Sequence, residues 1–373
     1  RDVYKRQDLG LDRDVDDLSG GQRTKILLGK LLLENPDILL LDEPTNYLDE
    51  ENIEWLKKYL QSYENAFILI SHDILFLNSV VNLIYHVEER KLTRYVGNYD
   101  EFQRIYSENK KKLEAAYERQ QKEIARLEDF VARTKANLAT SNMARSRQKR
   151  LDKMEKIELI PEKPKPKFNF KPARASGKVI FETKDLVIGY TSPLTKPLNM
   201  FMERGQKIVL VGANGLGKST LLKSLLGIVK PLSGEVNLGD YQHIGYFEQE
   251  DRADNRNTCI EEIWSEFPGY TQHQIRSALA KCGLTAKQLE SQIRVLSGGE
   301  AAKVRLCKIL NNETNILILD EPTNHLDLDA KNELKRALKE YKGSILLVSH
   351  ELEFYRDIVT DIWNCEDWTL KIV

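Results

Sequence analysis

The sequence has no apolar run long enough to span a bilayer. Runs such as "ILLL" and "FILI" have the length of a buried strand, far below the roughly 18 to 20 apolar residues of a membrane helix. Its four cysteines show no CxxC spacing and no regular spacing of the kind that a disulfide framework has. A structural zinc and disulfides are therefore not indicated, and we expect a soluble protein of the reducing cytoplasm. The cysteines are Cys259, Cys282, Cys307 and Cys365.

Two copies of one domain are present instead. "LSGGQ" at Leu18 recurs as "LSGGE" at Leu296, and "ILLLDEPTNYLD" at Ile38 recurs as "ILILDEPTNHLD" at Ile316. "LISHD" likewise recurs as "LVSHE", and every pair is offset by 278 residues. Agreement in both order and spacing indicates an internal repeat.

The first copy lacks a phosphate-binding loop. The second copy has "GANGLGKST", and the offset would place the first copy's loop about 66 residues before Arg1. We therefore interpret the chain as a fragment of a protein of about 470 residues that lacks roughly 100 at its start. We interpret the opening "RDVYKRQ" as a translated library-preparation scar, with a solvated N-terminus as the alternative. The predicted division is 1–7 as the scar, 8–100 as the rest of the first domain, 101–177 as a connector and 178–373 as the complete second domain.

The loop "GANGLGKST" matches the pattern G-x-x-x-x-G-K-[ST]. It follows the apolar strand "KIVLV" and precedes the helical "TLLKSLLG", which is the context that a nucleotide-binding loop needs. Backbone N–H groups and a helix N-terminus would hold phosphate there. Lys218 would reach the β- and γ-phosphates, and Ser219 would hold Mg²⁺. The candidate residues of the loop are Gly212, Ala213, Asn214, Gly215, Leu216, Gly217, Lys218, Ser219 and Thr220.

Two carboxylates end the buried-strand run "NILILDE". Asp320 suits Mg²⁺, and Glu321 suits the activation of the attacking water. His350 follows the apolar strand "SILLVS" and would contact the γ-phosphate. Gln249 would link Mg²⁺ and water to domain movement, and Tyr190 would stack on adenine. An exposed loop amide or a core tyrosine would look similar to these last two.

Residues 8–100 and 178–373 together resemble the ATP-binding cassette (ABC) superfamily. The resemblance implies that the LSGGQ motif covers ATP held by the opposite cassette, with Mg²⁺ as the cofactor. Ser19, Gly20, Gly21 and Gln22 would then close over the loop that begins at Gly212. It also implies inter-cassette loops at Asp49 and Asp327. A second, incomplete site would combine Asp42, Glu43 and His72 with Ser297, Gly298, Gly299 and Glu300.

The connector reads as two long helices between Glu101 and about Ile160. An apolar heptad runs through Leu113, Tyr117, Ile124, Leu127 and other positions, with Gln120 and Thr134 as the polar exceptions. A helix from 101 to 136 would be about 54 Å long, and the return helix would bring Met143, Leu151, Met154 and Ile157 against it. Residues 131–150 hold no acidic residue, and basic residues cluster there at the far end of the hairpin of a near-neutral protein, which favours contact with a phosphate backbone over a solvated face. They hold no aromatic residue either, so binding of RNA by shape and charge is favoured over base stacking. The basic candidates are Arg133, Lys135, Arg145, Arg147, Lys149 and Arg150.

Tandem cassettes joined by a basic helical hairpin resemble the ABC-F family of ribosome-associated ATPases, in which "DEPTNYLD" and "DEPTNHLD" are typical. The resemblance implies an α/β fold with two P-loop-type domains, the first partial, joined by an antiparallel helical hairpin. It implies a cytoplasmic monomer with intramolecular cassette pairing, whose hairpin approaches P-site tRNA on the ribosome. The short turn "LATSN" favours a translation factor over an antibiotic-protection protein.

Three other classes fit less well. An ATP-binding subunit of a membrane transporter has no need of a basic hairpin between fused cassettes. A chromosome-maintenance ATPase would carry its coiled coil between P-loop and LSGG, where this chain is continuous. The scattered cysteines argue against an iron–sulfur recycling ATPase.

Overall fold

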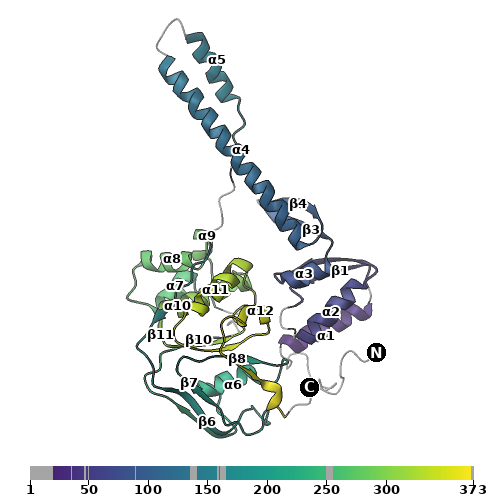
Figure 1. Ribbon diagram of the computed structural model, residues 1–373, viewed down its shortest axis with the longest axis vertical. Helices are drawn as coiled ribbons and strands as arrows, with labels where there is room; N and C mark the ends of the chain where they lie inside the picture. The colour runs from purple at the N-terminus through teal and green to yellow at the C-terminus, as the bar shows by residue number, and fades with distance from the viewer. Residues whose placement is uncertain are drawn as a thin grey trace. The chain divides into compact units, whose positions relative to one another are not determined.

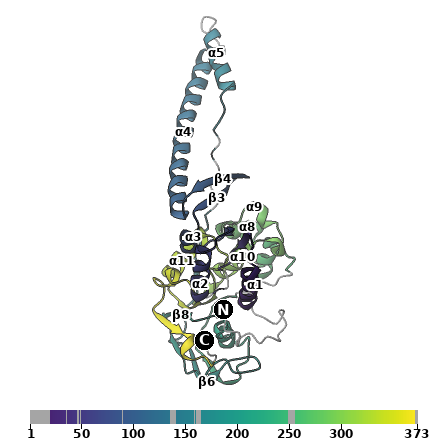
Figure 2. The same cartoon turned by 90° about the vertical axis from the view of Figure 1, so that its right-hand side faces the viewer.

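The computed structural model describes residues 20–34, 36–45, 48, 50–88, 90–134, 141–157, 159, 165–248 and 255–370. The chain forms two compact units, one of residues 74–163 and one of residues 1–73 together with 164–373. Figures 1 and 2 show the helices and strands of both. Among the described helices, none is long and apolar enough to cross a membrane.

A parallel sheet forms the centre of the second copy. Its described strands lie in the order β10-β12-β13-β8-β14. Residues alternate between two cores: Leu317 and Leu319 pack into one, and Ile316 and Ile318 into the other. Continuous apolar strands such as "ILILD" therefore form because both faces of this sheet are covered. The strands are β8 (Lys207–Val211), β10 (Ile244–Phe247), β12 (Ile316–Asp320), β13 (Ser344–Val348) and β14 (Asp361–Asn364).

Different layers cover the two faces. One core holds the apolar sides of α7 (Cys259–Glu266), α8 (Gln272–Lys281), α9 (Ala286–Leu289), α10 (Gly298–Asn311) and α11 (Leu328–Glu340). The other core holds α6 (Lys218–Leu225) and an antiparallel sheet of β7 (Phe201–Glu203), β6 (Val179–Val187) and β9 (Ser233–Leu238). The remaining elements are β5 (Lys171–Pro172), β11 (Glu313–Thr314), α12 (Leu352–Tyr355) and the short 3₁₀ helices Ile293–Val295 and Cys365–Asp367.

The first copy repeats the centre of this sheet. It comprises α1 (Gly20–Glu34), β1 (Ile38–Asp42), α2 (Glu50–Gln61) and β2 (Ala66–Ile70). Parallel pairing matches Asp42 with Ile70, as β12 and β13 match Asp320 with Val348, so the register recurs at the offset of 278. The side-chain burial differs: Ile38 is 61% exposed, whereas its counterpart Ile316 is 1% exposed. One face of β1–β2 is therefore uncovered within the described residues.

The unit of residues 74–163 contains a hairpin of helices. It comprises α3 (Ile74–Val80), β3 (Leu83–Glu88), β4 (Lys91–Val96), α4 (Tyr99–Thr134) and α5 (Ser141–Asp152). Helix α4 begins with a capping box, because Asn98 Oδ1 accepts from Glu101 N at 3.0 Å and Glu101 Oε2 accepts from Asn98 N at 3.1 Å. Helices α4 and α5 lie side by side in both views (Figures 1 and 2). Ile124 and Leu127 are buried, as the heptad predicts, whereas Leu113 is exposed.

The prediction of two long helices is wrong for the second one. Helix α5 ends at Asp152, and no described residue from 154 to 157 is helical. The amide of Gln120 donates to Glu155 O and accepts from Ile157 N, both at 2.7 Å. These bonds satisfy backbone groups that a continued helix would satisfy internally. Gln120, one of the two polar positions in the heptad, therefore bonds a return segment that is not helical.

Candidate nucleotide site

The phosphate-binding loop lies between β8 and α6, as its sequence predicts. Gly212, Gly215 and Gly217 have positive φ angles of 132°, 84° and 95°, which residues with a Cβ seldom adopt. Gly217 is the N-cap of α6. The ammonium group of Lys218 donates to the carbonyl oxygens of Gly212 at 2.6 Å and Ala213 at 3.0 Å. Its positive charge is therefore held within the loop where a phosphate would lie.

His350 Nε2 meets three groups at the carboxyl ends of the strands. It lies 3.0 Å from Lys218 Nζ, 3.0 Å from Asn214 Oδ1 and 3.2 Å from Glu321 Oε1. The neutral ring nitrogen either accepts from Lys218 or donates to one of the two oxygens, depending on its tautomer. Its bonding can therefore change when Lys218 moves.

Glu321 is held in an unusual environment beside this histidine. It has a φ angle of 48°, and its N–H donates to Val348 O at 3.1 Å. Burial raises the pKa of Glu321 to about 8, although the positive charge of Lys218 opposes this shift. A carboxyl group with such a pKa titrates in the range that suits a general base.

Asp320 provides oxygens that fit Mg²⁺. It is buried, and within the described residues neither carboxylate oxygen has a hydrogen-bond donor in regular geometry. Burial raises its pKa, and the nearby Ser219 hydroxyl and Lys218 charge partly offset that rise. The described residues contain no group of three or more side chains that could hold a metal alone. Ser219 and Asp320 therefore fit an ion that takes its other oxygens from phosphate and water.

Several other predicted residues of this site can be placed. Tyr190 is exposed, as a stacking residue must be, whereas Leu216 and Thr220 are buried in the base of the loop. Ser19 and Gln249 lie outside the described residues. Gly20, Gly21 and Gln22 begin α1, but their side chains also lie outside the described set. The predicted closure of LSGGQ over the loop stays a prediction.

The first copy repeats the glutamate–histidine pair. Glu43 has a φ angle of 46°, and His72 Nε2 lies 3.5 Å from Glu43 Oε1. Burial raises the pKa of Glu43, although the neighbouring His72 opposes the rise. Asp42 is exposed, unlike its counterpart Asp320. Within the described residues, the pair of Glu43 and His72 therefore resembles the pair of Glu321 and His350, whereas the neighbouring Asp42 is more exposed than Asp320.

The LSGGE motif of the second copy begins α10 with a capping box. Ser297 Oγ accepts from Glu300 N, and Glu300 Oε2 accepts from Ser297 N at 2.9 Å. Either Glu or Gln serves at this position of a capping box, which explains why Glu300 can replace the glutamine of the first copy. Cβ atoms on Gly298 or Gly299 would crowd His325. The pattern S-x-x-E could have predicted the cap, but nothing in the sequence indicated the contact with His325.

The inter-cassette candidates are placed only in part. Asp327 is the N-cap of α11, and its side chain accepts from Ala330 N at 2.9 Å and from Lys303. Asp49 lies outside the described residues.

The contact of Asn214 with His350 was not predicted from the sequence, because two loops far apart in sequence form it.

The basic candidates of the hairpin differ in their local contacts. Arg133 pairs with Asp129 at 2.9 Å, and Arg150 pairs with Glu123. Arg147 lies 3.5 Å above the ring of Phe130, which precedes the stretch without aromatics. Arg145 and Lys149 are exposed, and Lys135 lies outside the described residues.

Comparison with known proteins identifies the family. Models described as ABC transporter match residues 3–46 with 195–324, and residues 85–170. The chain is 72% identical to the ABC transporter ATP-binding protein YfmM of Bacillus subtilis (strain 168), over 98% of this chain and 71% of that protein. It is 39% identical to ABC transporter F family member 5 of Arabidopsis thaliana, over 96% of this chain and 53% of that protein.

Solved structures agree on the fold. The "Model of ribosome-bound archaeal Pelota and ABCE1" matches 94% of this chain and 54% of that chain with a TM-score of 0.58 at 20% identity. "RNase-L Inhibitor" matches 95% of this chain and 63% of that chain with a TM-score of 0.56 at 19% identity. These likenesses show an α/β fold with two cassettes, and the matched domains are those of ATP-hydrolysing P-loop enzymes. The chain spans about half the length of its Arabidopsis relative, and it belongs to the ABC ATPases of the ABC-F type.

Proposed function

We propose that this chain acts in an ATPase that binds the ribosome and regulates translation through the basic end of its helical hairpin, near P-site tRNA. The observation that carries the ATPase part is the meeting of Lys218, Glu321 and His350 within 3.2 Å at His350 Nε2. The ABC-F relatives support the ribosomal part, as does the fold shared with a structure whose title names a ribosome-bound protein. The proposal places the protein in the cytoplasm, where ribosomes act.

ATP binding would rearrange the contacts of the loop. Lys218 Nζ would leave Gly212 O and Ala213 O for the β- and γ-phosphates, while the backbone N–H groups of Gly212 to Thr220 enclose them. Ser219 and Asp320 would hold Mg²⁺, which neutralises charge on the phosphates. Gln249 would join this ion's environment, and exposed Tyr190 would stack on adenine.

Hydrolysis would depend on Glu321 and His350. The Glu321 carboxylate would accept a proton from the attacking water at Oε1 or Oε2. When Lys218 moves to phosphate, the tautomer of His350 with its proton on Nε2 would donate to a γ-phosphate oxygen in place of Asn214 Oδ1 or Glu321 Oε1. Loss of that oxygen after hydrolysis would restore the contacts with Lys218 and Asn214.

The two cassettes would pair within one chain. Ser19, Gly20, Gly21 and Gln22 would close over ATP held by the second cassette. Ser297 to Glu300 would face Asp42, Glu43 and His72 in the other site. ATP would favour this closed form because it binds that form more tightly than the open one.

Substitutions in the hairpin test the ribosomal part of the proposal. Arg145 and Lys149 are exposed on α5, so changing both to Glu should weaken ribosome binding and flatten its salt dependence. Lys111 and Lys112 on α4 are also exposed, and changing both to Glu gives a control with the same change in net charge. The assay is ribosome-stimulated phosphate release at several salt concentrations.

The expected result is a smaller salt slope for the Arg145 and Lys149 variant and the parental slope for the control. Equal slopes for all three proteins would show that the end of the hairpin is a solvated surface. An ATPase that ribosomes do not stimulate would contradict the ribosomal part of the proposal and leave the ATP site itself unaffected.

A further inference from the structure

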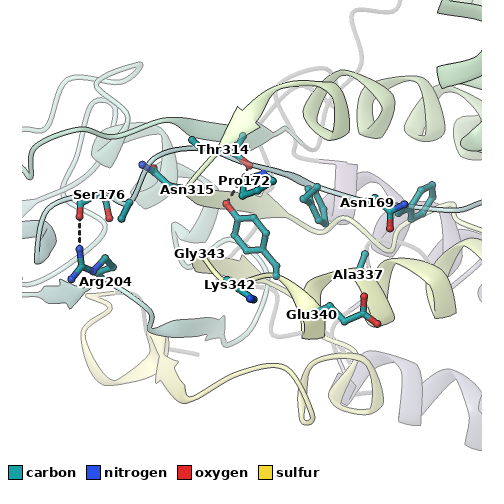
Figure 3. Close-up of a pocket in the computed structure, with 15 residues that line it drawn as sticks. Asn169, Pro172, Ser176, Arg204, Thr314, Asn315, Ala337, Glu340, Lys342 and Gly343 are labelled. Atoms are coloured by element: carbon teal, nitrogen blue, oxygen red, sulfur yellow. Dashed lines mark hydrogen bonds between the residues drawn. The ribbon is translucent and has the colours of Figure 1, made fainter. Parts of the chain in front are cut away.

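A cavity of about 430 Å³ lies in the second cassette, away from the nucleotide site. The segment 168–176 forms one wall, and the end of α11 with the loop before β13 forms another (Figure 3). Asn315 and Gly343, which line it, directly precede β12 and β13. Asp320 ends β12, so the length of a strand separates the cavity from the catalytic residues. Its volume is within the ordinary range of small-molecule sites.

Aromatic side chains form the apolar part of the cavity. The rings of Phe170 and Tyr341 meet edge to face at 5.4 Å, and Pro172 and Ala337 extend this surface. Tyr341 Oη donates to Thr314 Oγ1 at 3.2 Å, and burial raises the pKa of Tyr341 to about 12. The tyrosine therefore stays neutral and offers its ring to a ligand.

The backbone of the segment 168–176 is fixed to the cassette. Phe168 is fully buried, and its N–H donates to Glu333 at 2.8 Å. Its carbonyl oxygen accepts from Arg336 at 2.8 Å. Strand β5 pairs with β11 just beyond. The cavity is thus largely preformed, which lowers the cost of binding a ligand.

Two hydrogen-bond donors lie together at one end of the cavity. Ser176 is buried, and within the described residues its hydroxyl has no hydrogen-bond partner. Arg204 Nη1 donates to Ser176 O at 2.8 Å (Figure 3). No acidic side chain pairs with Arg204 in the described part of the chain. A buried hydroxyl without a partner costs free energy, and an oxygen acceptor placed beside Arg204 would satisfy both groups.

The charges of the cavity favour an anion at this end. Glu340 lies at the other end, with Asn169 (Figure 3), and its carboxylate pairs with Arg336. Asn315 has its side chain occupied by Arg174 O, Tyr241 O and His243 N. Arg204, Ser176 and the second lining cation, Lys342, are therefore the groups that remain to hold a charged ligand, and Arg204 lies beside Ser176.

We propose that this cavity binds a small monocarboxylate with a flat apolar body. Its carboxylate accepts from the Arg204 guanidinium and the Ser176 hydroxyl, and its ring packs on Phe170 and Tyr341. A guanidinium and a carboxylate form one of the strongest paired contacts in proteins. The site is independent of the ATP site and does not rest on the proposed ribosomal function.

The test uses three probes that share one apolar body. Isothermal titration of the full chain would compare 3-phenylpropionate with the neutral 3-phenylpropanol and the cationic 3-phenylpropylamine. The acid should bind with saturation and the other two at least about 10-fold more weakly, because only the acid accepts from Arg204. Equal binding of the three, or no saturable binding of the acid, would overturn the proposal without any variant.

Variants then locate the site. Arg204→Gln should weaken binding of 3-phenylpropionate by about 10-fold or more, and Ser176→Ala by about 5-fold. Arg174→Gln is the control, because Arg174 stacks on Tyr241 at 4.9 Å outside the lining. Unchanged affinity in both lining variants would overturn the proposal, as would an equal loss in the control.

Discussion

Replacing Glu321 by Gln should stabilise the resting protein while it abolishes hydrolysis. Burial raises the pKa of this carboxyl group from 4.5 to about 8. The folded state therefore prefers the protonated form. The free energy of unfolding is highest below about pH 4.5, and it falls as the pH rises to about 8, because ionising the buried group costs more than ionising it in the unfolded chain. At pH 7 the loss corresponds to about 3 kcal/mol. Glutamine cannot ionise, so the variant does not suffer this loss of stability.

Urea denaturation without nucleotide or divalent metal measures this effect. The free energy of unfolding of Glu321→Gln should exceed that of the parent by up to about 3 kcal/mol at pH 7, and by less than about 1 kcal/mol at pH 5. Glu353→Gln is the matched control, because Glu353 is an exposed glutamate on α12. It should change stability by less than about 0.5 kcal/mol.

The same variant should release phosphate at least about 100-fold more slowly, because it lacks the general base. A variant that is less stable than the parent at pH 7 would refute the raised pKa of this buried carboxyl group. A variant that hydrolyses ATP at the parental rate would refute its role as the base. The two results are independent, since one needs no nucleotide.

Three further changes probe other parts of the molecule. Asn214→Ala removes a contact worth about 1 kcal/mol, so kcat for ATP should fall about 5-fold with little change in KM; a change in KM alone would assign Asn214 to nucleotide binding. Gln120→Leu removes two hydrogen bonds of the hairpin, so hydrogen exchange at Ile157 should be about 30-fold faster; unaltered exchange would show that packing holds this segment. Although its burial alone would raise the pKa of Glu262, hydrogen bonds from Lys308 and two asparagines lower it to about 2, so the parent should lose stability as the pH falls from about 4.5 to 2. Glu262→Gln should flatten that loss, and a parental pH profile would contradict it.

The sequence predicted the strands of both copies because an apolar run is a local signal. Apolar runs with a two-carboxylate end became β1 and β12, and both pair in the same register with the strand that precedes a histidine. Glycines placed at positive φ formed the phosphate loop. The strands and the loop depend on residues close in sequence, so the sequence was enough to predict them, whereas the pairing of the strands is a finding of the structure.

Contacts between distant segments could not be predicted in this way. The non-helical segment after α5 is bonded to Gln120, which is 35 residues from its partner Glu155. The meeting of Asn214 with His350 joins loops 136 residues apart. The cavity beside Arg204 forms only where the segment after the hairpin packs against α11. Periodicity and motifs carry no information on such packing.

The central claim is that ATP directs this protein to the ribosome, and co-sedimentation tests it most directly. The chain would carry Glu43→Gln and Glu321→Gln, so that ATP bound at the loop of the second cassette is hydrolysed through neither glutamate. It would be centrifuged with ribosomes in ATP, in ADP and without nucleotide. The account predicts that the protein pellets with ribosomes in ATP and stays in solution in the other two conditions. Equal pelleting in all three, or none in ATP, would contradict it.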